Sequence, residues 1–187
     1  STEQNIKDIK DLLKAISDRE NNQKIILKSG MADARLPFLP KLVVGREDDL
    51  SNLKERLLIR KDKKIGIRGW PGVGKTTFVS LLANNVEIGQ YFSEGILWVS
   101  LGDKFTDHYS KLVSWCKTLG VEVPPDETKN LDGVNKLLQE RISEKNLIII
   151  DDLWKLDDAL PFLAVSQNST IVFTTRFLGV AQNLLDN

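Results

Sequence analysis

The chain has 187 residues and 41% of them are hydrophobic, which suits one well-filled core domain with an appendage better than two independent domains. Its 26 Lys and Arg balance 26 Asp and Glu, so no net charge draws it to nucleic acid or to an anionic membrane. The lone Cys116 and lone His108 exclude an internal disulfide and a Cys/His zinc cluster, and no apolar run reaches the ~18 residues that a membrane helix needs.

The amino-terminal segment begins with polar residues, unlike a secretion signal, so we expect a cytoplasmic protein with no membrane partner. Apolar residues then recur at helical spacing over residues 6–16, which predicts an amphipathic helix. Pro37 and Pro40 favour extended backbone before them and mark a boundary. We therefore predict a helical N-terminal segment or linker over residues 1–39 and a core domain over residues 40–187. The early helix fits core packing, the remainder of an effector domain or an oligomer contact equally well.

After this boundary, helical patterns alternate with short apolar runs. The run at 147–150 is apolar without alternation, as expected for a parallel strand that is covered on both faces. Strands are expected at 65–67, 95–100, 147–150 and 170–174. Helices are expected around the apolar faces of 50–58, 109–119 and 131–138, and from residue 76 onward. The alternation predicts an α/β fold, a three-layer sandwich with a parallel central sheet.

Residues 69–76 read GWPGVGKT and match the phosphate-binding pattern GxxxxGK[ST] in full, between an expected strand and an expected helix. Glycines let the backbone turn so that successive N–H groups point at one phosphate, and Lys75 adds a mobile charge for the outer phosphates. The Thr76 hydroxyl is positioned to ligate Mg²⁺, and Thr77 offers a second hydroxyl. The sequence therefore predicts a nucleotide-binding P-loop, whose contacts are Gly72, Val73, Gly74, Lys75, Thr76 and Thr77.

Two carboxylates, Asp151 and Asp152, follow the apolar run at 147–150. Ligands bind at the carboxyl ends of parallel strands, so these side chains are expected to form the second wall of the site. Asp151 would hold Mg²⁺ through water opposite Thr76, while Asp152 would orient or deprotonate the attacking water. The alternative interpretation is that these residues form a solvated loop after a buried strand. The presence of the P-loop makes this alternative less favoured than a role in the nucleotide site.

Arg176 follows the last expected strand, again at a carboxyl end. A guanidinium there could reach the γ-phosphate and distinguish a triphosphate from a diphosphate. A surface arginine after a strand is the alternative. The expected catalytic set is therefore Lys75, Asp152 and Arg176.

Four segments together resemble the NB-ARC family: VVGRE at 43–47, GWPGVGKTT at 69–77, LIIIDDLW at 147–154 and TIVFTTR at 170–176. This family belongs to the signal-transduction ATPases with numerous domains, which include plant disease-resistance receptors, apoptotic adaptors and bacterial regulators. The resemblance implies that backbone around Val44, Gly45 and Arg46 lines the adenine and that Arg176 senses the γ-phosphate. It also implies that the TIVFTT strand lies between the strands before the P-loop and before Asp151.

In that family a small helical domain and a winged-helix domain follow, and this sequence ends at Asn187 before either. We therefore expect a fragment that hydrolyses ATP poorly by itself, and whose effector and repeat domains belong to a longer protein. The last strand of the usual sheet is also expected to be missing, which would leave the P-loop strand near an edge and favour self-association.

The function expected from these observations is a nucleotide-controlled signalling switch that binds ATP or ADP and Mg²⁺ and hydrolyses ATP slowly. A DNA-associated ATPase of the AAA+ or initiator type is the alternative, which neutral net charge and the Asp-Asp pair disfavour. Salt-sensitive DNA binding would distinguish the two. A small-molecule kinase is a third possibility, for which the sequence shows no acceptor motif.

Overall fold

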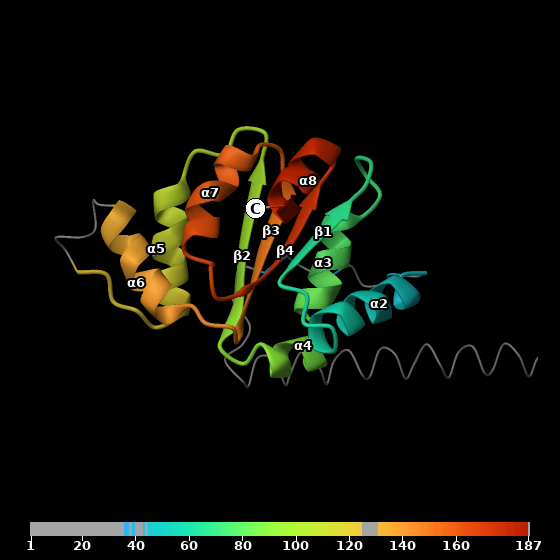
Figure 1. The fold of residues 1–187 in the computed structure, drawn as a ribbon, viewed down its shortest axis with the longest axis horizontal. Coiled ribbons are helices and arrows are strands. Elements are labelled where there is room, and N and C mark those ends of the chain that lie inside the picture. Colours follow the sequence, from blue (N-terminus) through green and yellow to red (C-terminus); the bar gives the residue numbers. More distant parts are fainter. Residues whose placement is uncertain (1–35, 38, 40–42, 44, 125–130, 187) are drawn as a thin grey trace, which may run out of the picture.

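The computed structural model describes residues 36, 37, 39, 43, 45–124 and 131–186. The helix expected at 6–16 and the boundary expected at residue 40 lie outside the described residues. Four strands alternate with helices along the described chain (Figure 1): α2 (Glu47–Leu58), β1 (Lys64–Arg68), α3 (Lys75–Ala83), α4 (Val86–Tyr91), β2 (Gly95–Gly102), α5 (His108–Thr118), α6 (Leu131–Arg141), β3 (Asn146–Leu153), α7 (Leu156–Ala164), β4 (Thr170–Thr175) and α8 (Leu178–Asp186).

The four described strands form one sheet in the order β1-β4-β3-β2, and every neighbouring pair is parallel. The β4 strand therefore lies between β1, which precedes the P-loop, and β3, which contains Asp151 near its carboxyl end, as the resemblance implied. In the described sheet β1 stands at one edge. The parallel arrangement places the carboxyl ends of all four strands at the same edge of the sheet, where ligands of such folds bind.

Helices cover both faces of this sheet, and each face has its own apolar core. On one face α2, α3 and α4 pack against residues such as Ile149 and Val172, and on the other α5, α6, α7 and α8 pack against residues such as Ile150 and Phe173. Successive residues of β3 thus point into different cores, which is why the run at 147–150 shows no polar alternation. The predicted three-layer α/β sandwich is confirmed.

Three described helices were not expected from the sequence: α4, α7 and α8. The first is capped at its amino end by Asn85, whose side chain accepts hydrogen bonds from the N–H groups of Glu87 and Ile88. The second carries Pro161 in its interior, which obscures the helical pattern. The third has Ala181 and Leu184 three residues apart on its buried face. Both α7 and α8 complete the core over β3 and β4.

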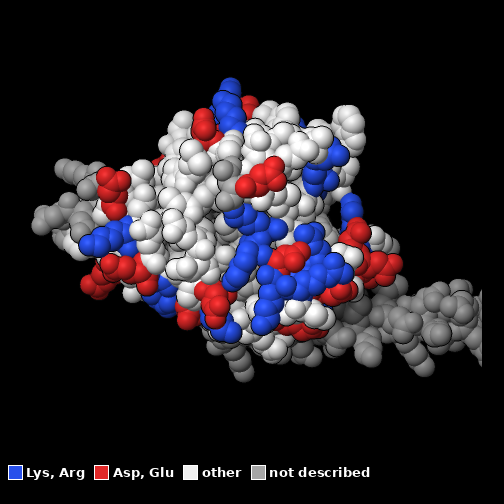
Figure 2. Space-filling view, viewed as in Figure 1, with Lys and Arg blue, Asp and Glu red and all other residues white. Residues whose placement is uncertain are grey.

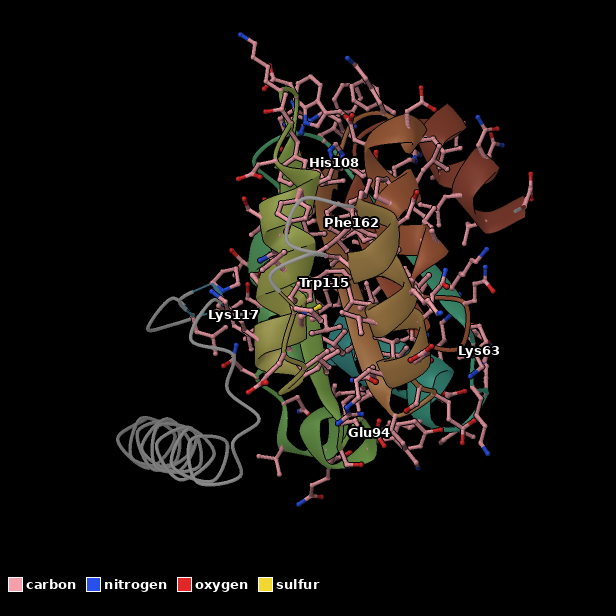
Figure 3. All side chains as sticks on the ribbon, turned by 90° about the vertical axis from the view of Figure 1, so that its left-hand side faces the viewer. Lys63, Glu94, His108, Trp115, Lys117 and Phe162 are labelled. Atoms are coloured by element: carbon pink, nitrogen blue, oxygen red, sulfur yellow. The ribbon has the colours of Figure 1, made fainter. Side chains whose placement is uncertain are left out.

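The core beneath α5 and α7 is aromatic. Figure 3 shows Trp115 and Phe162 pointing toward each other, and their ring centroids are 5.1 Å apart. The Trp115 indole N–H donates to the carbonyl of Trp98 at 3.2 Å, so the buried ring has its polar group satisfied. His108 lies at the outer end of the same cluster, with 5.8 Å between its ring centroid and that of Phe162. Cys116 is fully buried in the same core, and burial raises the pKa of its thiol.

Side chains of both charge signs lie on the surface (Figure 2), in agreement with the equal numbers of basic and acidic residues in the sequence. Figure 2 shows Lys and Arg side chains gathered over the lower part of one face, with Asp and Glu side chains among them. Oppositely charged side chains pair at several places on the surface, as in the ion pairs Arg56–Asp62 and Arg60–Glu55. None of the helices in the described part of the chain is long and apolar enough to cross a membrane.

Candidate functional site

The P-loop joins β1 to α3, and α3 begins at Lys75. Gly72 and Gly74 adopt positive φ angles of 77° and 85°, a region that residues with a Cβ rarely occupy. These two glycines let the loop turn tightly before the helix starts. The loop and the amino end of α3 thus meet at the carboxyl end of β1, as a phosphate-binding loop requires.

The side chain of Lys75 curls back over this loop. Its Nζ atom donates to the carbonyl oxygens of Gly69 at 2.9 Å and Trp70 at 3.0 Å. The start of the loop is in turn tied to β4, because the N–H of Gly69 donates to the carbonyl of Thr175 at 3.3 Å. The ammonium group is therefore held beside the loop, and one of its two partners, Gly69, is itself hydrogen-bonded to the sheet.

Arg46 reaches the P-loop through its side chain. One guanidinium nitrogen donates to the carbonyl of Val73 at 2.6 Å, and the other pairs with Asp49 at 3.1 Å. Gly45, just before it, has a φ of 75°. This places the Gly45–Arg46 segment beside the loop, although the residues are far apart in sequence. Val44, expected to line the base, lies outside the described residues.

A hydrogen bond joins the P-loop to the end of β3. The Thr76 hydroxyl donates to Asp151, with 2.9 Å to Oδ2 and 3.1 Å to Oδ1. Asp151 is only 2% exposed, so its carboxylate is fixed between the loop and the sheet. The residues expected from the sequence to form the two walls of a magnesium site therefore lie in contact. Thr77 follows inside the first turn of α3.

Thr174 is a site residue that the sequence did not reveal. Its hydroxyl donates to Asp151 Oδ1 at 2.7 Å and accepts from the N–H of Asp152 at 2.8 Å. This side chain is fully buried in β4, so both bonds are shielded from water. One hydroxyl thereby orients both acidic residues. A Thr two residues before Arg176, in a buried strand, was the available signal, but its hydrogen-bond partners depend on which strands are neighbours.

Asp152 and Arg176 also lie together. Asp152 has a φ of 52°, which is unusual for a residue with a side chain, and the β3–β4 register shifts between Ile150 and Leu153. The irregularity turns the Asp152 side chain toward β4, where Arg176 reaches its Oδ1 atom at 3.4 Å. The two residues expected to handle the water and the γ-phosphate thus form a long ion pair at the sheet edge.

A cavity of about 540 Å³ adjoins the P-loop between α2, β1 and α3. Its size falls in the range of roughly 300–1,000 Å³ that small-molecule sites occupy. Four cationic side chains line it, against the two carboxylates of Asp48 and Asp49, so its lining favours an anion. The cationic residues are Arg46, Arg56, Arg68 and Lys75.

The donor atoms at the Thr76–Asp151 contact suit a hard cation. A hydroxyl and a carboxylate offer only oxygen, the ligand type that Mg²⁺ prefers, and Mg²⁺ takes its remaining ligands from water and phosphate. Within the described residues no group of three or more His, Cys, Asp or Glu side chains could hold a metal ion alone. The geometry therefore fits an ion that arrives with a phosphate ligand.

Comparison with known proteins agrees with this geometry. The model of the NB-ARC domain family matches residues 46–187. A protein of Solanum demissum named as a late blight resistance protein homolog (R1B-19) is 29% identical over 165 residues, which cover 84% of this chain and 12% of that protein. An Arabidopsis thaliana protein named as a disease resistance protein (At1g59620) is 28% identical over 184 residues, or 91% of this chain and 20% of that protein.

A second Arabidopsis thaliana protein, named as disease resistance RPP13-like protein 1, is 31% identical over 153 residues, which cover 74% of this chain and 14% of that protein. The chain thus spans one fifth or less of the length of these three relatives. The family match contains the P-loop, the two aspartates near the carboxyl end of β3 and the arginine after β4. The chain therefore belongs to the NB-ARC domain family, whose members are nucleotide-binding signalling modules.

Proposed function

We propose that this chain is the ADP- and ATP-binding domain of a nucleotide-controlled signalling switch, and that it hydrolyses ATP slowly in the presence of Mg²⁺. The observation that carries the proposal is the hydrogen bond between Thr76 and the buried Asp151, because it joins the P-loop to the end of β3. A solvated loop after a buried strand would not be expected to accept a hydrogen bond from a P-loop hydroxyl. The nearby Asp152–Arg176 pair adds the groups that hydrolysis and phosphate sensing need.

In this proposal the loop residues bind and the strand-end residues act on the terminal phosphate. The N–H groups around Gly72 and Gly74, together with the amino end of α3, would receive the phosphates. Lys75 would leave its loop carbonyls and offset the charge of the outer phosphates. Arg46 holds the Val73 carbonyl and would keep the loop in shape. Val44, Gly45 and Arg46 are proposed to border the adenine.

Hydrolysis requires a positioned water and a proton acceptor. Asp152 would hold the water in line with the γ-phosphorus and accept its proton as the bond to the ADP oxygen breaks. Thr174 fixes the backbone N–H of Asp152 and so the place of this carboxylate. Thr76 and Asp151 would hold Mg²⁺, which supplies charge neutralisation at the phosphates when it is bound. Arg176 would contact the γ-phosphate.

Replacing Asp151 by Asn is expected to remove the dependence of nucleotide affinity on Mg²⁺. The amide keeps the shape and can still accept from Thr76, but it lacks the charge that orients a metal-bound water, a change worth about 10- to 100-fold in metal affinity. The measurement is a calorimetric titration with ADP in Mg²⁺ and in EDTA. Asp157→Asn, at an exposed position of α7, is the matched control and should keep the Mg²⁺ effect. An unchanged Mg²⁺ effect in Asp151→Asn would contradict the metal role.

Asp152→Asn tests the hydrolytic half of the proposal. Loss of a general base lowers a rate by about 10² to 10⁴, so phosphate release should fall to that extent while ADP affinity is retained. Release is measured in a single turnover, with protein in excess over γ-labelled ATP, because turnover is expected to be slow. Wild-type hydrolysis that persists unchanged in Asp152→Asn would exclude the proposed role. Labelled phosphate released from GTP and not from ATP would exclude the adenine assignment.

The switch is proposed to work inside a longer cytoplasmic receptor. The relatives carry names of disease resistance proteins and are five or more times longer than the part that this chain matches. Effector and repeat domains of such a receptor would be its partners, and ATP would favour self-association. The described edge of β1 offers unpaired backbone groups for that purpose.

A further inference from the structure

Trp154 stacks on Arg176. Trp154 follows β3 and Arg176 follows β4, and because these strands are parallel neighbours both residues leave the same edge of the sheet. The guanidinium carbon of Arg176 lies 4.2 Å from the centroid of the Trp154 ring, which is close for a cation–π contact. Phe177 supports the indole from another side, in an edge-on contact with 5.4 Å between ring centroids. The indole therefore forms a flat support for the guanidinium.

Few other groups restrain this guanidinium. Its second constraint is the ion pair with Asp152, which is long at 3.4 Å and joins side chains that are 29% and 32% exposed. Ion pairs of that kind contribute little. Two buried donors, Arg176 Nε and Trp154 Nε1, have no hydrogen-bond partner within the described part of the chain. The ring face is thus the main feature that fixes the plane of Arg176.

We propose that Trp154 is a positioning residue that sets the preference of this site for a triphosphate over a diphosphate. This inference rests on the proposed function, because it concerns how Arg176 recognises the γ-phosphate. The stacked ring holds the guanidinium flat at the strand ends, 3.4 Å from Asp152, the residue that follows the carboxylate bonded to Thr76. A γ-phosphate arriving there finds the guanidinium already oriented and loses less free energy in ordering it.

The same geometry couples sensing to hydrolysis. A terminal phosphate carries more charge than Asp152 and can take the guanidinium from its long ion pair. Asp152 is then released to hold the water, so Arg176 and Asp152 change partners together. ADP has no γ-phosphate, and Arg176 would stay with Asp152.

The test measures affinity for ATP and for ADP in the full chain. Trp154→Leu keeps an apolar side chain but removes the aromatic face. A cation–π contact of this kind corresponds to about a 2- to 30-fold change in affinity, so the Kd for ATP should rise by that factor while the Kd for ADP stays unchanged. Trp154→Phe retains a smaller ring and should recover part of the loss. Should Trp154→Leu fail to fold, Arg176→Lys carries the same expectation, because it keeps the charge but not the planar group that stacks.

A double variant separates positioning from a merely structural role. If Trp154 acts through Arg176, adding Trp154→Leu to Arg176→Ala should not weaken ATP binding further. Equal losses for ATP and ADP, or a loss that persists in the Arg176→Ala background, would overturn the inference and leave the proposed function standing. A folded wild-type chain that binds neither nucleotide would instead overturn the proposed function, and this inference with it.

Discussion

Replacing Lys75 by Ala is expected to weaken the binding of both ADP and ATP by about 10- to 100-fold, the effect of losing one charge-assisted contact to phosphate. The side chain already lies over the loop, where its Nζ atom contacts the Gly69 and Trp70 carbonyls. Those carbonyls accept from a mobile ammonium that can transfer to a phosphate without a change in the backbone. Calorimetric titration of the variant with each nucleotide measures the loss.

The matched control is Lys117→Ala. Lys117 lies on the exposed side of α5, and Figure 3 shows it away from the strand ends. Both variants remove one positive charge, so a general change in net charge would weaken both alike. Equal affinities in wild type and Lys75→Ala, in folded samples, would contradict the role of this lysine.

Replacing Trp115 by Ala is expected to lower the free energy of unfolding by about 3–5 kcal/mol, the usual cost of truncating a buried aromatic ring. Trp115 is fully buried, packs against Phe162 and donates its N–H to the Trp98 carbonyl. Truncation would open a cavity between α5, α7 and the sheet. Domains of this size have about 5–15 kcal/mol of stability in total, so much of the margin would be lost.

Urea unfolding followed by circular dichroism measures this change. Trp115→Phe should cost less, because it keeps a ring against Phe162 and loses only volume and the donor. Trp70→Ala removes the same side chain at a position that is 82% exposed and should change stability by about 0.5 kcal/mol or less. A Trp115→Ala variant as stable as Trp70→Ala would contradict the described core.

The centre of the sheet was predictable from sequence because β3 and β4 are buried on both faces. The run at 147–150 has no polar residue and stands directly before two carboxylates, so both its strand character and the place of Asp151 follow from local pattern. The P-loop was equally visible, because its glycines and Lys75 have fixed spacing. The contact between Thr76 and Asp151 follows once two parallel strands end at one edge.

Other features depend on which strands are neighbours, and no local pattern carries that information. Thr174 reads as an ordinary strand residue, and it bonds Asp151 only because β4 lies beside β3. The Trp154–Arg176 stack arises from the same neighbouring strands. The positive φ of Asp152 accompanies a register shift between β3 and β4. The sequence of β3 alone does not indicate such a shift.

If this chain binds an adenine nucleotide at its P-loop, equilibrium titration of the folded chain with ADP and GDP in Mg²⁺ should reveal it. We expect saturable binding of one ADP per chain, weaker binding of GDP, and loss of the ADP signal in Lys75→Ala. Absence of binding to either nucleotide, in a sample whose circular dichroism shows the α/β fold, would contradict this expectation.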